Sequence, residues 1–216
     1  MNNLLGILLS YLYIAIVIVF AKFFVNYGKE ASRKFIHIML GNWWIIAMYF
    51  FDNVIYASFV PATFVIINYL SYKKDIIKVM ERSDNKQEGL GTVYYAISLL
   101  ILSIVTFGII KKPELGLVAV FIMAYGDGLA AVIGKKINSF NYKIKDTEKS
   151  LAGSLTMFII TLIIISLYLL YINSTLIVIK AVVISTIITL IEGISIKGTD
   201  NITVPISAFL ILLVII

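Results

Sequence analysis

An aspartate lies between two glycines in the segment Met123–Lys136, MAYGDGLAAVIGKK, which is otherwise largely apolar. A carboxylate inside a membrane helix costs at least about 2.5–3.5 kcal/mol, so Asp127 must face a partner, a metal ion or a water-filled pocket. Gly126 and Gly128 leave room beside it for a ligand or another backbone, and Ala131 continues this narrow helix face. We expect this face to contact substrate. The alternative is a helix-packing face on which Asp127 pairs with a lysine.

Cations and a histidine gather in the segment 29–42, KEASRKFIHIMLGN. Arg33 or Lys34 falls on the same helix face as His37, because residues three or four apart are neighbours on a helix. The guanidinium of arginine binds two phosphate oxygens at once. We therefore expect Arg33 and Lys34 to bind the phosphates of an anionic substrate, and His37 to act in catalysis by neutralising charge on the transferring group. The alternative is a set of cations that anchor the helix at the membrane surface, with a hydrogen-bonded histidine.

A helix start with anion-binding character is predicted in the segment 148–158, EKSLAGSLTMF. Ser150 can cap the helix, and the free amides of the first turn attract anions. Lys149 lies beside these amides, and Gly153 and Ser154 follow one turn later. We expect these residues to hold phosphate, with Lys149 also acting in catalysis. An ordinary capped span with a lysine reaching the headgroups is the alternative.

Acids and an amide also flank the last apolar stretch, in the segment 191–205, IEGISIKGTDNITVP. Glu192 lies near the membrane edge and is a candidate substrate contact. Asp200 and Asn201 precede Pro205, and proline suits the first turn of a helix. Asp200 and Asn201 can therefore cap this helix or help to hold a metal ion. In the second case Asp200 is a catalytic residue and Asn201 contributes to nucleotide binding.

These four segments together predict metal-assisted phosphate chemistry on a lipid. The chain has no cysteine and one histidine, so any metal must be held mainly by oxygen ligands, which favours Mg²⁺. Asp127 and Asp200 are the expected metal ligands, and either one could instead accept a proton from the substrate. The cations and the helix amides would then bind phosphate, while the membrane delivers the acceptor.

The elements that position these residues are membrane helices. Of the 216 residues, 61% are hydrophobic and 14% charged, whereas a soluble domain is nearer half apolar and a quarter charged. We predict an all-α, polytopic helical bundle of seven or eight transmembrane helices in a single domain, 1–216. Segment 73–90 is either a short interfacial helix or a solvated loop. The expected spans are 4–25 (retained rather than cleaved as a signal peptide), 35–51, 54–72, 92–110, 114–134, 151–172, 175–196 and 203–216.

The lysines and arginines predict how the bundle is oriented. Fifteen of the eighteen fall in the connections on one side of these spans, and Lys111, Lys112 and Lys180 fall on the other. The positive-inside rule places the first side in the cytoplasm. All four polar segments lie toward that side, so we expect an integral protein of the cell membrane with a site facing the cytoplasm.

The chain resembles the membrane lipid kinases grouped as phytol kinase, dolichol kinase and CTP-dependent diacylglycerol kinase. The matching pieces are RKFIH with Gly41, GDGLA with GKK, KSLAGS and DNITVP, in the family's order. GDGLA and KSLAGS look most like the phytol kinase branch. Dolichol kinases usually have Glu where this chain has Ala152.

The resemblance implies an alcohol kinase that uses CTP and Mg²⁺. The acceptor would be a long-chain isoprenoid alcohol such as phytol, geranylgeraniol or a polyprenol of the dolichol type. The partners are then the bilayer, the alcohol and a nucleoside triphosphate, with no nucleic acid, and the oligomeric state stays open.

Three other functions remain open at this stage. Two share most of these parts: a phosphatidate cytidylyltransferase-like CDP-lipid synthase and a CTP-dependent diacylglycerol kinase. The long signature of the synthases, around His-Gly-Gly and Asp-Arg, is not found in this sequence. The third is a transporter of an anionic solute or lipid, whose polar residues would lie near the middle of the membrane. Here they lie toward one face.

Overall fold

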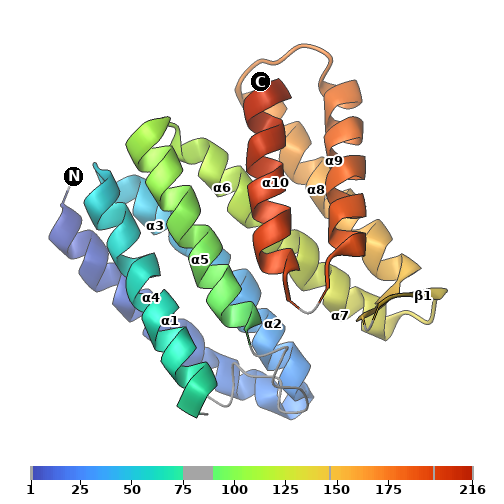
Figure 1. The fold of residues 1–216 in the computed structure, drawn as a ribbon, viewed down its shortest axis with the longest axis horizontal. Helices are drawn as coiled ribbons and strands as arrows, with labels where there is room; N and C mark the ends of the chain where they lie inside the picture. The colour runs from blue at the N-terminus through green and yellow to red at the C-terminus, as the bar shows by residue number, and fades with distance from the viewer. Residues whose placement is uncertain (1, 75–89, 146, 197, 216) are drawn as a thin grey trace.

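The fold, given by a computed structural model that describes residues 2–74, 90–145, 147–196 and 198–215, is a bundle of helices (Figure 1). Most of segment 73–90 lies outside the described residues. A two-stranded antiparallel hairpin adds the only strands of the described part. The prediction of an all-α membrane bundle is confirmed. The helices are α1 Asn3–Phe24, α2 Lys29–Gly41, α3 Trp43–Phe50, α4 Val54–Lys74, α5 Gly91–Ser103, α6 Pro113–Phe121, α7 Gly128–Lys136, α8 Leu151–Tyr171, α9 Ile177–Ile194 and α10 Asp200–Ile215.

Six helical stretches of the described chain are long and apolar enough to cross a membrane. Two of them contain a π-helical segment: Ile104–Ile109 follows α5, and Ile122–Asp127 joins α6 to α7. A seventh apolar helix, α10, is shorter. The predicted count of seven or eight is therefore close, with the short elements accounting for the difference.

The expected continuous span 35–51 is wrong, because the helix breaks at Asn42 between α2 and α3. Gly41 lies so close to Ala124 that a side chain there would collide with it. The Tyr125 hydroxyl donates a hydrogen bond to Asn42 Oδ1 at 2.8 Å. Close packing against the π-helical segment thus holds the chain at the point where it changes helix.

The start of the last helix also differs from the prediction. We expected Pro205 in the first turn, but α10 begins at Asp200, so Pro205 lies inside the helix. Asn201 is consequently in the first turn of α10, where a backbone N–H has no acceptor within its own helix. The early start places Asp200 next to the end of α9, close to the Glu192 carboxylate.

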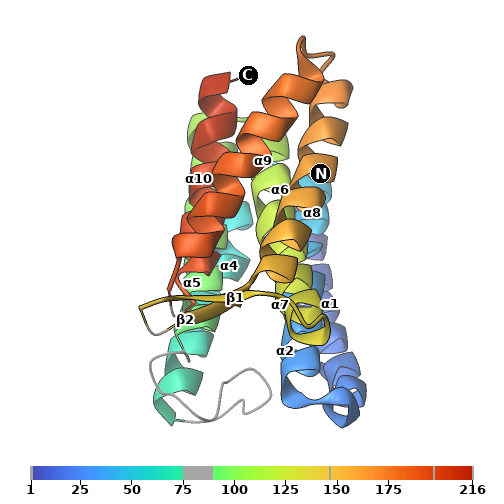
Figure 2. The same cartoon turned by 90° about the vertical axis from the view of Figure 1, so that its right-hand side faces the viewer.

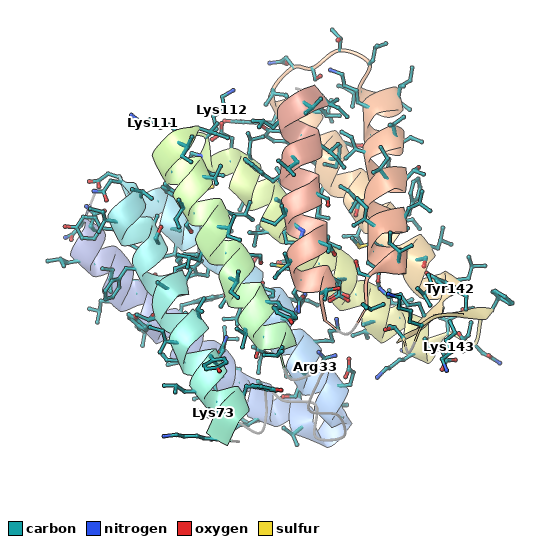
Figure 3. All side chains as sticks on the ribbon, viewed as in Figure 1. Arg33, Lys73, Lys111, Lys112, Tyr142 and Lys143 are labelled. Atoms are coloured by element: carbon teal, nitrogen blue, oxygen red, sulfur yellow. The ribbon has the colours of Figure 1, made fainter. Side chains whose placement is uncertain are left out.

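Charged side chains separate toward the two ends of the bundle (Figure 3). Lys111 and Lys112 lie at one end, and Arg33, Lys73 and Lys143 lie at the other. The hairpin, β1 Asn141–Ile144 and β2 Thr147–Ser150, crosses this second end (Figure 2). The basic end of the bundle is therefore also the end that carries the polar segments found in the sequence.

Candidate functional site

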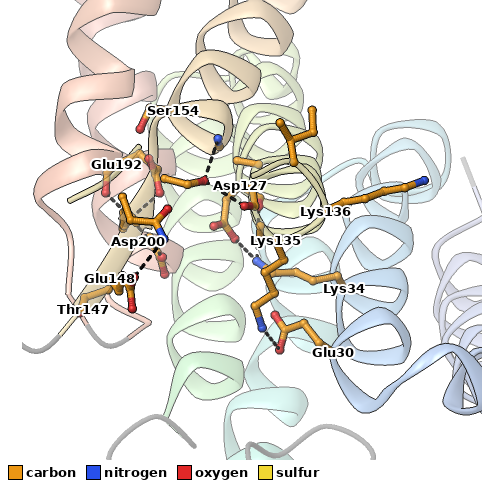
Figure 4. A pocket seen from close by; sticks show the side chains of 18 of the residues that line it. Glu30, Lys34, Asp127, Lys135, Lys136, Thr147, Glu148, Ser154, Glu192 and Asp200 are labelled. Carbon is orange, nitrogen blue, oxygen red and sulfur yellow. Dashed lines mark hydrogen bonds and ion pairs between the residues drawn. The ribbon is translucent and has the colours of Figure 1, made fainter. Parts of the chain in front are cut away.

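Three carboxylates from distant parts of the sequence meet at the basic end of the bundle. Asp127 ends the second π-helical segment, Glu192 lies near the end of α9, and Asp200 starts α10. One oxygen of each lies within 4.8 Å of the others. Asp127 and Glu192 are buried, and Asp200 is partly buried. Figure 4 shows the three side chains in the pocket that they line. Like charges held this close repel, so the cluster needs cations to stabilise it.

The π-helical segment Ile122–Asp127 positions the first of these acids. Its wider turn shifts the following residues relative to a regular α-helix, and π segments are often found at functional sites. Gly126 and Gly128 flank Asp127 and allow close packing. A side chain at Gly126 would collide with Met157, and one at Gly128 with Ile38.

Two residues of α2 contact Asp127. Lys34 Nζ lies 2.8 Å from Asp127 Oδ2, and both side chains are almost entirely buried. His37 Nε2 lies 3.3 Å from the same oxygen and 3.1 Å from the carbonyl oxygen of Met123. Asp127 therefore pairs with a lysine, as the packing alternative supposed. That lysine, however, belongs to the cationic segment predicted to bind phosphate, so the pair lies within the polar site.

The second cation of the site is Lys149 of strand β2, whose side chain reaches the end of α9. Its ammonium forms an ion pair with the Glu192 carboxylate and lies 4.0 Å from Asp200 Oδ2. Burial lowers the pKa of Lys149, but the Glu192 and Asp200 carboxylates outweigh this effect and raise it above its usual value. Lys149 is thus a permanent cation at neutral pH.

The predicted start of α8 is confirmed as a capped helix N-terminus. Ser150 Oγ accepts a hydrogen bond from the Gly153 amide at 3.1 Å, and it donates one to the Gly134 carbonyl at 3.2 Å. Ser154 Oγ is paired with the Tyr142 hydroxyl at 2.6 Å, which ties the hairpin to α8. These hydroxyls therefore have structural partners, and Lys149 is the charged residue beside them among those predicted to hold phosphate.

Close approach of α7 and α8 holds this helix start in place, and Gly134 is the contact point. A Cβ at Gly134 would lie 2.5 Å from Ser150 Oγ and 3.2 Å from the Gly153 Cα. We expect Gly134→Val to destabilise the protein by about 1–3 kcal/mol, through overpacking and loss of the cap. The measurement is thermal unfolding in detergent. The control is Val132→Ile, which adds bulk on the exposed side of the same helix; equal stability of the two variants would contradict the prediction.

A cavity of about 600 Å³ contains this arrangement. Of the candidates from sequence, Gly126 and Gly128 do not line it and instead serve helix packing. The others line it together: Arg33, Lys34, His37, Asp127, Ala131, Lys149, Ser150, Gly153, Ser154, Glu192, Asp200 and Asn201.

The hairpin contributes lining residues that were not predicted from the sequence, among them Asn141, Thr147 and Glu148. Asn141 Nδ2 donates a hydrogen bond to Glu148 Oε1 at 3.1 Å across the two strands. The only local signal was the short alternation of Tyr142 and Ile144 with polar residues, which is too brief to predict a strand.

Several buried polar atoms at the cavity have no hydrogen-bond partner within the described part of the chain. They are Glu192 Oε2, Asn201 Oδ1 and Arg33 Nε. Buried polar atoms are normally paired, so such groups call for an explanation. An unpaired carboxylate oxygen beside two further carboxylates fits a divalent cation with oxygen ligands. An unpaired guanidinium nitrogen fits an anion such as phosphate.

Curated relatives of this chain are phytol kinases. It is 29% identical over 189 residues to phytol kinase of Synechocystis sp., covering 84% of this chain and 78% of that protein. It is 30% identical to a probable chloroplastic phytol kinase 1 of Glycine max and 30% identical to chloroplastic phytol kinase 1 of Arabidopsis thaliana. These matches cover 82% and 84% of the chain but 64% and 65% of the plant proteins, which is less than two thirds of their length. No family model and no solved structure matches the chain.

Proposed function

The chain is a homologue of the phytol kinases, and we propose that it phosphorylates the hydroxyl of a long-chain isoprenoid alcohol. Phytol kinase relatives support a membrane-embedded kinase that acts on an alcohol. For this chain we propose CTP as the donor, Mg²⁺ as the metal and the cytoplasmic face as the site of reaction. The cytoplasmic orientation rests on the lysine and arginine distribution.

The observation that carries the proposal is the juxtaposition of three carboxylates with buried cations in one polar cavity. Phosphoryl transfer needs little covalent chemistry from the protein, and it depends on positioning and charge stabilisation. Asp127, Glu192 and Asp200 are the groups that would hold a divalent ion. When bound, such an ion would neutralise charge on the phosphate oxygens of the donor.

The protein's own cations would act on the same phosphates. Lys149 and Arg33 line the cavity and can donate charge-assisted hydrogen bonds to phosphate oxygens. Lys34 and His37 hold the Asp127 carboxylate in place through their contacts with Oδ2. We therefore assign Lys149 and Arg33 to phosphate binding, and Lys34 and His37 to positioning Asp127.

The proposed reaction is a displacement at the terminal phosphorus of the donor. The alcohol oxygen forms a bond with the terminal phosphorus of the donor. The bond from that phosphorus to its bridging oxygen breaks, and this oxygen keeps the electron pair on the departing nucleoside diphosphate. The hydroxyl proton passes to one of the carboxylates of the acidic cluster.

Labelled nucleotide tests the function directly. Membranes containing the protein, incubated with Mg²⁺, geranylgeraniol and CTP labelled at the γ-phosphate, should yield a labelled lipid monophosphate. CTP labelled at the α-phosphate should leave the lipid unlabelled. Transfer of the α label would instead identify a CDP-lipid synthase, and a product formed only from added diacylglycerol would identify a diacylglycerol kinase.

Chelation of divalent ions should stop the reaction, and added Mg²⁺ should restore it. Replacing CTP by ATP in a parallel reaction measures the preference for the base.

A further inference from the structure

A second, smaller cavity lies beside the polar one, between α2, α4 and α5. Its lining is apolar on one side, where Ile36, Leu40 and Tyr95 contribute. Asn68 of α4 also lines it and donates a hydrogen bond to the Thr92 carbonyl of α5 at 3.0 Å. The residues that line both cavities are Arg33, His37, Gly91 and Asn201. We call these four the junction.

The junction carries an unused hydrogen-bond acceptor. Asn201 Nδ2 donates to the Gly91 carbonyl at 2.9 Å, which fixes the amide group. Asn201 Oδ1 is buried and has no partner within the described part of the chain. An alcohol hydroxyl can donate to an amide oxygen of this kind. The Tyr95 hydroxyl cannot compete readily, because it already donates to the His37 carbonyl at 3.0 Å.

The two cavities differ in what they can bind. Ion pairs and polar side chains dominate the larger one, so a hydrocarbon chain placed there would strip water from charges without compensation. The smaller one presents apolar side chains, and each methylene group buried against them contributes about 0.8 kcal/mol. A molecule with one polar end and one apolar end is matched by the two cavities together.

We propose that the smaller cavity binds the hydroxyl-bearing end of the isoprenoid alcohol, with its hydroxyl donating to Asn201 Oδ1 at the junction. This proposal rests on the proposed function and assigns the acceptor's place within it. The oxygen of the alcohol then faces the polar cavity, where the terminal phosphate of the donor is bound. As its bond to phosphorus forms, the hydroxyl proton leaves Asn201 Oδ1 and passes to a carboxylate of the acidic cluster. Asn201, expected from sequence to assist the metal, acts on the acceptor instead.

The rest of the alcohol would extend along α4. α4 packs against α1 and α5, and α2 packs against α1 and α7, so the smaller cavity lies where these helices meet. On α4, the neighbours of Asn68 are exposed apolar side chains, namely Ile67, Tyr69 and Leu70. A long tail can therefore remain among the lipid chains along α4 while only its polar end enters the protein.

Filling the smaller cavity tests this assignment. We expect Leu40→Trp to lower kcat/KM for geranylgeraniol by about tenfold or more, because one added group in an apolar pocket shifts specificity by this order. The KM for the nucleotide should stay at the wild-type value, which also shows that the variant is folded. The control is Ile45→Trp on α3, an exposed position that gains the same bulk. Unchanged kcat/KM for the alcohol in Leu40→Trp, or a raised KM for the nucleotide alone, would overturn the proposal.

A binding measurement separates this proposal from the proposed function. A geranylgeraniol analogue with a diazirine next to its hydroxyl should label residues of α2 and α5 that line the smaller cavity, and Leu40→Trp should suppress that labelling. Labelling confined to α8 and α9 would overturn the assignment of the acceptor site. Failure of the wild-type protein to phosphorylate any alcohol would instead refute the proposed function, whatever the labelling shows.

Discussion

Asp127→Asn is expected to reduce alcohol phosphorylation by at least about a thousandfold while the protein remains inserted in the membrane. The substitution keeps the shape of the side chain but removes the charge that pairs with Lys34 Nζ at 2.8 Å. It also removes one of the three carboxylates that lie within 4.8 Å of one another. Turnover with the labelled nucleotide measures the loss.

The charge left on Lys34 complicates this variant, because an unpaired buried ammonium destabilises the fold. The double variant Lys34→Met with Asp127→Asn removes both charges and should recover thermal stability without recovering activity. Glu114→Gln is the matched control, since Glu114 lies at the opposite end of the same membrane helix, in the first turn of α6. Near-normal turnover by Asp127→Asn would remove this residue from the catalytic site.

Lys149→Gln is expected to reduce activity by about a hundredfold to a thousandfold, through the loss of a cation that stabilises charge on the transferring phosphate. The variant should also be less stable, because Glu192 and Asp200 lose their shared cation. Lys143→Gln is the control, since Lys143 is an exposed lysine of the same hairpin and lies opposite Glu148 in the strand register. Equal activity of the two variants would contradict the role given to Lys149.

The pH dependence of this stability difference has a defined sign. Because the folded protein raises the pKa of Lys149, its stabilising effect is complete below the pKa of an unfolded lysine and is lost as the pH rises through the folded pKa. The margin in melting temperature between wild type and Lys149→Gln should therefore stay constant from about pH 6 to about pH 9. A margin that already shrinks between pH 6 and pH 8 would indicate a different cause.

The sequence by itself determined the class of fold and about half of the residues that line the cavity. Long apolar stretches have one stable form in a bilayer, because every backbone amide must be bonded within its own helix. The cost of burying Asp127 in such a stretch marked it as a candidate from its position alone. The same holds for His37, and the cap at Ser150 was evident from local chemistry.

Only the tertiary structure decided which of these groups meet. Glu192 was expected to contact substrate, and its place with Asp127 and Asp200 in one carboxylate cluster depends on how α9 and α10 approach the π-helical segment. No local pattern encodes such an approach, since packing between distant helices determines it. The break at Asn42, the ion pair of Lys149 with Glu192 and the shared junction of the two cavities arise in the same way, because each requires contacts between segments far apart in the chain. Side-chain chemistry is local and can be inferred from sequence, whereas its convergence into a site is a property of the packed fold.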